Sequence, residues 1–577
     1  MPPILRRLLG GLGGDHQARA LNEQGISAWA RGDLAAAERA FRAVLATRER
    51  FAGAASNLGM VLVEQRRFDE GLHLLRRAVE IDSRHVGARV NLANTLHLGG
   101  DLEGALRELR AALEIEPDSP LVHANIIRPL MEACDWPGVA CELDYLNGLA
   151  PTLPEAEWAD RLTPFTALLL PMAPELQLIV ARSYAQRVTA EMSSQPRPQW
   201  RGDAGASRLR IGYVSCDFHN HATAHLTAGL YGAHDRSRFE VYAYSFGPDD
   251  GSEYRRRIVE GCDRFVDVSA EPPAATAARI AADGIHVLVD LKGYTGGGRP
   301  HIFALRPAPL QVNFLGYPGS MGATFIDYII ADRQLVLPGE EPYYAEAVVR
   351  MPGSYQVNDA GQRIADLPPS RAACGLPEHA FVFCCFNHTF KIEAHVFARW
   401  MRVLGAVPGS VLWLMRSNRV AERNLRAAAS SAGIDPARLV FAPVVAKPDH
   451  LARHRHAGLF LDTYTYNAHT TGSDALWAGV SIVTCKGGAF PARVGASLLN
   501  ASGLPELVCA DFDAYEALAV DLARDPPRLG HVRARLVGNR QRAALFDTVA
   551  YTRSLEAAYL EMWRRRSGGL APAAIAL

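Results

Sequence analysis

A 34-residue repeat near the N-terminus limits what this chain can fold into more than any other feature of its sequence. Small residues stand at Gly25, Gly59 and Ala93, and a second small residue follows each of them twelve positions later. A large apolar residue comes four positions after that, which gives the sets Ala37, Gly71, Ala105 and Phe41, Leu75, Leu109. Repeats of this length are helical units that cannot bury their apolar faces alone. Three units in register therefore predict a stack of helix pairs, an α-solenoid.

The pattern resembles the tetratricopeptide repeat, in which small residues let two helices pack closely and large ones fill the space between them. Gly32, Arg66 and Gly100 are predicted to form the turn within each unit. A fourth unit, residues 122–149, departs from the pattern and is expected to cap the array. We assign residues 15–150 to the repeats and expect a protein or peptide to bind in their concave groove. A solenoid with a purely structural role is the alternative.

The composition of the 577 residues excludes several classes of protein. Lys and Arg together number 61, as do Asp and Glu, so no basic excess favours a nucleic-acid partner. No apolar run approaches the roughly 18 residues that a membrane span needs, and the opening residues make a poor signal peptide. The nine cysteines are scattered without a C-x-x-C pair, and Cys384 and Cys385 are expected to be buried thiols. These observations predict a reduced, cytoplasmic protein that binds neither nucleic acid nor membrane.

After the repeats the pattern changes to strands that alternate with helices. Residues 151–205 are predicted to be a helical linker, residues 206–372 and 373–545 two α/β lobes, and residues 546–577 a C-terminal helix and tail. The predicted strands are Leu209–Ser215, Phe239–Ser245, Ile285–Asp290, Leu310–Leu315, Ala380–Phe386, Ser410–Met415, Leu439–Ala442, Leu459–Asp462 and Ser481–Cys485. Alternation of this kind predicts mostly parallel sheets. Two such lobes predict a ligand cleft at the carboxyl ends of their strands.

The segment after the strand Leu459–Asp462 carries the clearest binding signal. Thr470 and Thr471 open a helix there, and the unpaired N–H groups and positive dipole of a helix N-terminus favour phosphate. Asp474 follows at a spacing of three and four residues, so its carboxylate shares a helix face with the two hydroxyls. The hydroxyls would bond phosphate oxygens, and the carboxylate would accept from sugar hydroxyls. Ordinary N-capping by threonine is the alternative.

Two other loops that follow strands carry groups suited to chemistry. Lys391 follows the first strand of the second lobe and would neutralise a leaving phosphate; the alternative is an ordinary solvated lysine. His219, His221 and His225 follow the first strand of the first lobe. Their spacing lacks the further ligands of a metal site, which favours acid–base or hydrogen-bonding roles.

Two further motifs are interpreted as structural. Asp511 and Asp513 form a D-x-D pair of the kind that holds a divalent metal in some sugar-nucleotide enzymes, but a helical run follows directly. Helix capping is therefore favoured over metal binding. The triple glycine Gly296–Gly298 lacks the spacing of either phosphate-loop fingerprint and is expected to be a permissive turn. The sequence predicts no metal site.

Taken together, the segments resemble the O-linked N-acetylglucosamine (O-GlcNAc) transferases, and more closely their bacterial homologues. The resemblance covers nearly the whole chain and rests on the repeats and on five motifs that follow them. The motifs are IGYVSCDFHNH at 211–221, ALRPAP at 304–309, LGYPG at 315–319, Asn387 to Lys391, and His469-Thr-Thr. The resemblance implies a GT-B core of two Rossmann-like lobes, UDP-N-acetylglucosamine (UDP-GlcNAc) as the donor, inversion at the anomeric carbon, and no metal or other cofactor.

The resemblance also implies roles for individual residues. His221 matches the histidine proposed in the family as catalytic base or acceptor-side group, and Lys391 matches the lysine that contacts the diphosphate. The other residues implied to bind the UDP-sugar are Asn387, His388, Val445, Lys447, His450, His469, Thr470, Thr471 and Asp474. Within this set the diphosphate turn is 469–471, Asp474 is the ribose carboxylate, and Lys447 and His450 lie beside ribose and uracil. The sugar and acceptor pocket would contain Leu315, Gly316, Tyr317 and Pro318.

Some features depart from the family pattern. His388 stands where the animal enzymes have glutamine, the repeats are fewer, and the animal insert between the lobes is missing. Two alternatives stay open. The first is a related transferase that uses UDP-glucose or GDP-fucose, although His469 and Asp474 fit the GlcNAc pattern better. The second is a non-catalytic adaptor, which would be free to lose Lys391 or the Thr-Thr turn that this chain retains.

Overall fold

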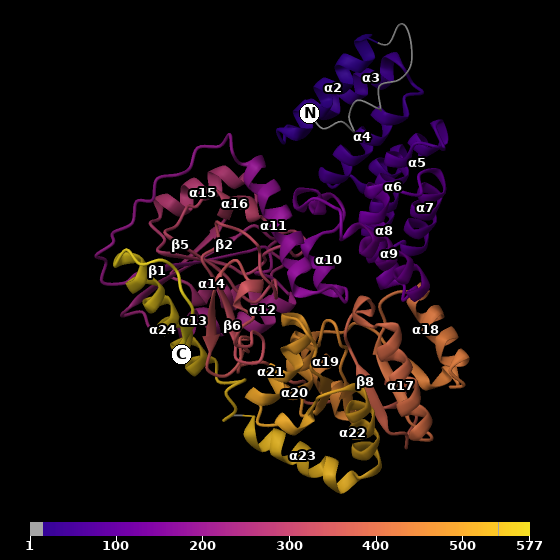
Figure 1. Cartoon of the computed structure of the whole chain (residues 1–577), viewed down its shortest axis with the longest axis vertical. Coiled ribbons are helices and arrows are strands. Elements are labelled where there is room, and N and C mark those ends of the chain that lie inside the picture. The colour runs from indigo at the N-terminus through magenta and orange to yellow at the C-terminus, as the bar shows by residue number, and fades with distance from the viewer. Residues whose placement is uncertain (1–15, 541) are drawn as a thin grey trace. The chain divides into compact units, whose positions relative to one another are not determined.

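The chain divides into two compact units, residues 1–148 and 149–577. The computed structural model describes residues 16–540 and 542–577. In the described part of the first unit, helices follow one another with only short turns between them (Figure 1). They are α2 (His16–Ala30), α3 (Leu34–Thr47), α4 (Ala52–Glu64), α5 (Phe68–Ile81), α6 (Val86–Leu98), α7 (Leu102–Ile115), α8 (Pro120–Glu132) and α9 (Trp136–Leu149). From α2 to α8 each helix packs against the next, which confirms the predicted α-solenoid.

The 34-residue period is present in the structure as a recurring left-handed turn residue. Gly32, Arg66 and Gly100, which were predicted to form the turns, have φ angles of 79°, 66° and 84°. Cys134 stands 34 positions after Gly100 and has a φ of 51°, so the divergent fourth unit keeps the same turn. This conformation is free of strain for glycine alone, because a Cβ crowds the following carbonyl.

The small residues of the repeat lie where two helices approach each other most closely. A Cβ added to Gly25 would lie 2.6 Å from the Phe41 ring, and one added to Gly59 would lie 2.8 Å from Cγ of Leu75. Phe41 and Leu75 are fully buried, and burial of such a side chain contributes about 1.5–3 kcal/mol. The predicted pairing of small with large residues is confirmed at both positions.

The second unit begins with short helices that lead to the first sheet. They are the 3-10 helix η1 (Glu155–Asp160), α10 (Pro164–Leu169) and α11 (Pro174–Glu191). Helix α11 packs against η1 and against α16 (Pro300–Ala304). The polar stretch after α11 ends at Trp200, whose indole Nε1 donates to the carbonyl oxygen of Ile285 at 2.8 Å. This hydrogen bond holds the end of the linker against the first sheet.

The first sheet is parallel, and its described strands have the order β14-β7-β6-β5-β4-β1-β2-β3. Their bounds are β1 (Leu209–Ser215), β2 (Phe239–Ser245), β3 (Arg264–Asp267), β4 (Val287–Asp290), β5 (Leu310–Asn313), β6 (Tyr328–Asp332), β7 (Ala347–Met351) and β14 (Ile575–Ala576). The connecting helices include α12 (Ala222–Thr227), α13 (Leu230–Ala233), α14 (Glu253–Gly261) and α15 (Pro273–Ala282). All four strands predicted in this lobe are present. Strands β3, β6, β7 and β14 were not predicted.

The second sheet is also parallel, and its described strands have the order β10-β9-β8-β11-β12-β13. Their bounds are β8 (Val382–Cys385), β9 (Val411–Met415), β10 (Leu439–Ala442), β11 (Leu459–Leu461), β12 (Ile482–Cys485) and β13 (Val508–Cys509). The accompanying helices are α17 (Ala394–Ala406), α18 (Arg419–Ser431), α19 (Lys447–Arg453), α20 (Thr470–Trp477), α21 (Val494–Ala501), α22 (Phe512–Arg524) and α23 (Pro526–Asn539). All five predicted strands are present, and Cys384 and Cys385 are fully buried as expected. The prediction of repeats followed by two α/β lobes is therefore confirmed.

The C-terminal helix α24 (Thr548–Ser567) returns to the first lobe (Figure 1). Its Glu556 carboxylate lies 3.0 Å from Nδ1 of the buried His234. Beyond the helix, β14 pairs with β7, so the end of the described chain belongs to the first sheet. Among the described residues, no helix combines the length and the apolar character that a membrane crossing requires.

Candidate functional site

A cavity of about 700 Å³ lies between the two lobes. The loops that follow β1, β4, β5, β8, β10 and β11 all contribute to its wall, so it lies at the carboxyl ends of both parallel sheets, as predicted. The predicted site residues that line it are His221, Leu315, Gly316, His388, Lys391, Val445, Lys447, His450, His469, Thr470, Thr471 and Asp474. Residues as far apart in sequence as His221 and Asp474 are thus brought to one cavity.

The first turn of α20 faces this cavity. Thr470 and Thr471 begin the helix, and the N–H groups of a first turn have no acceptor within the helix, so they can bind an anion. The Thr471 hydroxyl donates to the side-chain oxygen of Asn387. The Asn387 amide in turn donates to Oγ1 of Thr463 at 2.8 Å. Asn387 is 2% exposed and supports the start of α20 instead of lining the cavity.

Lys391 lies at the same end of the cavity. It ends the short turn η4 (Thr389–Lys391) after β8, and its Nζ donates to the carbonyl oxygen of Asn467 at 3.0 Å. The Nζ atom also lies 4.2 Å from the centroid of the Tyr466 ring. Because β8 and β11 are neighbours in the sheet, the loops that carry Lys391 and the start of α20 leave the same edge. The ammonium and the helix N-terminus can therefore meet the charge of one anion.

His469 is the N-cap residue of α20 and is held as a neutral ring. Its Nδ1 lies 3.2 Å from the Tyr355 hydroxyl and its Nε2 lies 3.4 Å from the carbonyl oxygen of Pro491. The ring stacks on Tyr466 at 4.5 Å. Burial, with Lys391 nearby, lowers the pKa of His469 well below its usual value. These partners fit the tautomer in which Nε2 donates to Pro491 and Nδ1 accepts from Tyr355.

The other end of the C-terminal wall combines an ion pair with a second neutral histidine. Lys447 begins α19, and its Nζ binds the Asp474 carboxylate on α20. Burial raises the pKa of Asp474, and Lys447 opposes that change. Nδ1 of His450 accepts from Arg453 at 2.7 Å, and burial lowers the pKa of His450 well below its usual value. With Val445 beside them, these groups suit the hydroxyls and base of a nucleotide better than its phosphates.

On the facing wall, His221 is the N-cap residue of α12. Its Nδ1 accepts from the N–H of Thr223 at 3.2 Å and lies 3.3 Å from Oδ2 of Asp217. Burial lowers the pKa of His221 although Asp217 opposes this, so the ring is neutral near pH 7. His225 also lines the cavity, and burial lowers its pKa to about 3. His219 does not line it.

Several lining residues were missed by the sequence analysis. They include Phe165, Asp217, Lys292, Tyr355, Gln356, Arg453 and Tyr466. Asp217 and Lys292 each stand in a loop directly after a predicted strand, which is the same sequence signal that Lys391 carries. Phe165 lies in α10, and Tyr355 follows β7, a strand that was not predicted, so neither residue stood next to a predicted strand end.

Leu315 and Gly316 lie where the loops after β4 and β5 come together. Leu315 has a φ of 70°, a strained value for a residue with a side chain, and such strain is often found at functional sites. A Cβ on Gly316 would lie 2.0 Å from the carbonyl oxygen of Leu291, so only glycine fits there. Both residues line the cavity.

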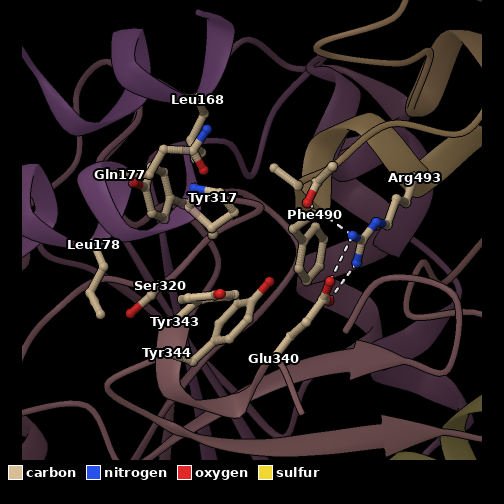
Figure 2. A pocket seen from close by; sticks show the side chains of 14 residues that line it. Leu168, Gln177, Leu178, Tyr317, Ser320, Glu340, Tyr343, Tyr344, Phe490 and Arg493 are labelled. Atoms are coloured by element: carbon tan, nitrogen blue, oxygen red, sulfur yellow. Dashed lines mark hydrogen bonds and ion pairs between the residues drawn. The ribbon is translucent and has the colours of Figure 1, made fainter. Parts of the chain in front are cut away.

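The other two residues predicted for that pocket lie elsewhere. Tyr317 lines a second, much smaller hollow, shown in Figure 2, and the buried Pro318 lines neither. At one side of this hollow Arg493 of the C-terminal lobe donates to both oxygens of Glu340 in the N-terminal lobe, at 2.5 and 2.8 Å (Figure 2). The pair joins the lobes next to the loop that carries Leu315.

The structure gives each of the two motifs that were interpreted as structural a structural role. Asp511 is the N-cap of α22, where its side chain accepts from the N–H of Ala514 at 2.8 Å, and Asp513 pairs with Arg399 at 2.7 Å. Gly297 has a φ of 79°, as expected of a permissive turn. Within the described residues, no group of three or more His, Cys, Asp or Glu side chains is placed to hold a metal ion.

Comparison with protein families gives three matches. A model of glycosyl transferase family 41 matches residues 134–369 and 367–555. Two tetratricopeptide-repeat models match residues 22–82 and 62–125. The family 41 match covers most of the second unit, which contains the cavity.

Comparison with individual proteins agrees with the family matches. A probable UDP-N-acetylglucosamine–peptide N-acetylglucosaminyltransferase of Arabidopsis thaliana, SEC, is 38% identical over 424 residues, 71% of this chain and 43% of that protein. A UDP-N-acetylglucosamine–peptide N-acetylglucosaminyltransferase of Caenorhabditis elegans is 31% identical and covers 70% of this chain and 46% of that protein. The chain thus spans less than half the length of these curated relatives. The solved structure of a lysine-to-methionine mutant of the Thermobaculum terrenum O-GlcNAc transferase superposes with a TM-score of 0.69 at 30% identity, and the match covers 97% of this chain and 100% of that one.

Proposed function

Because the chain belongs to glycosyl transferase family 41, we propose that it moves N-acetylglucosamine from UDP-GlcNAc to serine and threonine hydroxyls of proteins. The observation that carries the proposal is the cavity in which Lys391 and the first turn of α20 lie together. A sugar nucleotide brings two negative charges to such a site. The names of the plant and nematode relatives support UDP-GlcNAc as the donor.

In this proposal the C-terminal lobe binds the donor. The diphosphate lies against the N–H groups of Thr470 and Thr471 and against the Lys391 ammonium. Asp474, which pairs with Lys447, accepts from the ribose hydroxyls, and the neutral His450 ring packs beside uracil. The ammonium and the helix N-terminus together offset the charge that develops on UDP as it leaves. The proposed reaction uses no metal ion, since these groups supply the positive charge.

The acceptor is activated from the facing wall. The acceptor oxygen attacks the anomeric carbon on the side opposite UDP, the bond from that carbon to the diphosphate oxygen breaks with its electron pair, and the hydroxyl proton passes to Nε2 of His221. The configuration at the anomeric carbon is inverted. A neutral imidazole is required for this step, and burial keeps His221 in that form near pH 7. Leu315 and Gly316 close the sugar and acceptor side of the cavity.

The repeats are proposed to recruit the acceptor protein. Concave repeat surfaces commonly bind extended polypeptide. The solenoid of α2 to α8 offers such a surface, whereas the cavity itself is sized for a nucleotide and a short stretch of acceptor. Protein substrates, rather than small-molecule acceptors, follow from this division.

The direct test offers the full chain a choice of donors. Purified protein is incubated with a protein lysate in three parallel reactions, which contain UDP-GlcNAc, UDP-glucose or GDP-fucose. The mass added to acceptor proteins and peptides is measured by intact-mass and peptide mass spectrometry. The proposal expects a gain of one N-acetylhexosamine on Ser or Thr with the first donor alone. The anomeric configuration of the product, read by NMR, tests inversion. Transfer from UDP-glucose or GDP-fucose alone would show that this nucleotide sugar, and not UDP-GlcNAc, is the donor. UDP binding without transfer from any donor would indicate an adaptor.

A further inference from the structure

Lysine is rare in this chain and concentrated at the cavity. Only four of the 61 basic residues are lysines, and they stand at positions 292, 391, 447 and 486. Three of the four, Lys292, Lys391 and Lys447, line the cavity between the lobes. An ammonium is a compact point charge, whereas the guanidinium of arginine is a planar fork, so the two are not interchangeable in a small site. The proposed donor site uses Lys391 and Lys447 but leaves Lys292 without a role.

Lys292 is fixed in position at the end of β4. The Asp290 carboxylate accepts from the N–H groups of Lys292 and Gly293, both at 2.8 Å, which sets the direction of the loop. Since β4 pairs with β1, the side chain reaches the loop after β1. There Nζ donates to both oxygens of Asp217, at 2.8 and 2.9 Å. The two side chains are only 9% and 4% exposed, so the ion pair is almost removed from bulk water.

The carboxylate bound by Lys292 also lies beside the proposed base. Oδ2 of Asp217 is 3.3 Å from Nδ1 of His221 and accepts from the Thr223 hydroxyl at 3.2 Å. The neutral His221 ring has two tautomers, which give Nδ1 different hydrogen bonds. Nδ1 accepts from the N–H of Thr223 when the ring proton is on Nε2, or it carries the proton toward Asp217 and leaves the Nε2 lone pair open. Only the second tautomer can take a proton from an acceptor hydroxyl at Nε2.

We propose that Lys292 is a positioning residue of the transfer reaction, which keeps Asp217 ionised and prevents the Asp217–His221 pair from holding an extra proton. The proposal rests on the proposed function. Without the ammonium, the buried carboxylate would lose its partner, and an unpaired buried charge is costly. Asp217 and His221 would then share a proton, and the base would enter the reaction already occupied. With the ammonium in place, His221 enters it neutral, with Nδ1–H directed at Asp217.

The electrostatic environment agrees with this role. Burial opposes ionisation of Asp217, but the neighbouring His221 and Lys292 outweigh it and lower the pKa of the carboxyl. Burial lowers the pKa of His221, Asp217 raises it and Lys292 lowers it. Other titratable groups near His221 are His219 at 5.7 Å between ring centroids, Asp250 at 3.9 Å from His219, His225 on α12, and Lys391, Lys447, His450 and Asp474 on the opposite wall. The Cys216 thiol donates to Oδ1 of Asp217 at 3.2 Å. Burial raises the pKa of the Cys216 thiol to about 12, so that group is neutral, and Lys292 is the cation that binds the carboxylate in contact with His221.

A purely structural ion pair would behave differently. Buried pairs contribute little net stability compared with apolar side chains of similar volume, but loss of one partner is destabilising in either case. A change in unfolding temperature therefore cannot separate the two roles. The protonation state of His221 separates the two roles, because only the positioning role requires Lys292 to control that protonation.

The first test measures that protonation without turnover. The full chain is labelled with ¹³C-histidine, the His221 ring signal is assigned by its loss in His221→Gln, and the signal is titrated by NMR in the parent and in Lys292→Gln. We expect the pKa of His221 to rise by about one unit in Lys292→Gln. Lys486→Gln is the matched control, because Lys486 does not line the cavity, and it should leave His221 unchanged.

Asp217→Asn supplies a second variant with the opposite expected sign. It removes the carboxylate that favours the imidazolium, so the pKa of His221 should fall. This variant also decides the matter if Lys292→Gln does not fold. A His221 titration equal to that of the parent in folded Lys292→Gln, or in Asp217→Asn where the lysine variant does not fold, would overturn the proposal.

The second test measures turnover against pH. In Lys292→Gln the acid limb of kcat/KM should move to higher pH, kcat at pH 7 should fall about tenfold, and the Kd of UDP should stay within about threefold of the parent value. Lys292→Arg retains a cation but replaces a compact ammonium with a planar fork, so it should restore the position of the acid limb without restoring the full rate. A loss of equal size at every pH would mean that Lys292 is only structural. Because the NMR titration needs no transfer, a chain that transfers no sugar would end the proposed function while His221 protonation still decides the role of Lys292.

Discussion

The Nζ atom of Lys391 lies 4.2 Å from the centroid of the Tyr466 ring. This contact joins the loop after β8 to the loop after β11, the two segments that form the anion-binding end of the cavity. The same ring stacks on His469, the N-cap residue of α20, at 4.5 Å. One aromatic side chain therefore contacts both sources of positive potential at that end. A contact between an ammonium and a ring contributes about 0.5–2 kcal/mol, depending on desolvation.

Replacing Lys391 with alanine should nearly abolish transfer while the fold is kept. The ammonium lies beside the helix N-terminus where the leaving diphosphate is proposed to bind, and loss of one such group costs on the order of 10²–10³ in kcat. Steady-state kinetics and thermal unfolding of Lys391→Ala are compared with those of Lys486→Ala. Activity within about threefold of the parent, with matching unfolding, would remove Lys391 from the mechanism.

Replacing Asp511 with alanine should affect stability and leave transfer unchanged. Its carboxylate accepts from the N–H of Ala514 at the start of α22, and loss of an N-cap of this kind costs about 1 kcal/mol. The free energy of unfolding and the rate of transfer are measured with and without EDTA. Strong inhibition by EDTA that Mn²⁺ reverses, in the parent but not in Asp511→Ala, would mean that the D-x-D pair binds a metal.

Much of the fold could be predicted because the patterns that specify it are local. The 34-residue period reports the packing of Gly25 on Phe41 and of Gly59 on Leu75, and each contact lies within one helix pair. The predicted strands are three to seven residues long in the structure and consist mostly of buried apolar residues, which show directly in the sequence. Strand β14 could not be predicted, because Ile575–Ala576 is too short to show a pattern and pairs with β7 more than two hundred residues away.

The candidate site could be predicted only in part, for a related reason. Thr470, Thr471 and Asp474 share one helix turn, so their common face is visible in the sequence. The ion pair of Lys292 with Asp217 joins two loops 75 residues apart, and neither residue alone indicates the other. The resemblance implied that Tyr317 belongs to the acceptor pocket with Leu315 and Gly316, but its side chain lines the hollow of Figure 2. Adjacency in sequence did not predict a common direction of side chains.

The stability of the N-terminal lobe should depend on pH through Glu346. Its carboxyl group is buried, accepts from the Ser320 hydroxyl and the Met321 N–H at 2.7 Å each, and burial raises its pKa to about 7. A raised folded-state pKa means that the protonated carboxyl stabilises the fold. That contribution is complete below the unfolded-state pKa near 4.5 and is lost as the pH rises through about 7.

Glu346→Gln should remove this dependence. The amide stays uncharged at every pH, so the variant should be more stable than the parent at pH 8 by roughly 1–3 kcal/mol, and the difference should shrink toward pH 5. Chemical denaturation at both pH values measures it. The exposed Glu378→Gln is the control and should follow the parent. A variant that is less stable than the parent at pH 8 would show that the ionised carboxylate is the stabilising form.

The turn residues of the repeats should differ in their tolerance of a side chain. Gly100 has a φ of 84°, so Gly100→Ala places a Cβ in the left-handed region and should destabilise α6 and α7 by about 1 kcal/mol. Arg66 already accepts that strain at a φ of 66°, so Arg66→Gly should change the local stability by less than about 0.5 kcal/mol, because relief of strain is offset by the entropy of glycine. Hydrogen exchange of peptides from these helices measures both changes. Equal exchange in Gly100→Ala and the parent would contradict the strain argument.

Removal of most of the repeats should separate donor binding from protein glycosylation. A truncation that deletes residues 1–118 keeps Ser119, the N-cap of α8, and with it α8, α9 and the whole second unit. The residues proposed to bind UDP, from Lys391 through Asp474, all lie in that unit, so the calorimetric Kd of UDP should stay within a few-fold of the parent value. Transfer to whole-protein acceptors should fall about tenfold or more, because the repeats are proposed to supply the extended contacts with the acceptor.

Circular dichroism first establishes that the truncated chain is folded. A short Ser-containing peptide serves as the matched acceptor, because transfer to this peptide should fall much less. If UDP affinity falls together with transfer in a folded truncation, the repeats support the catalytic unit itself; if neither falls, the repeats do not recruit the acceptor.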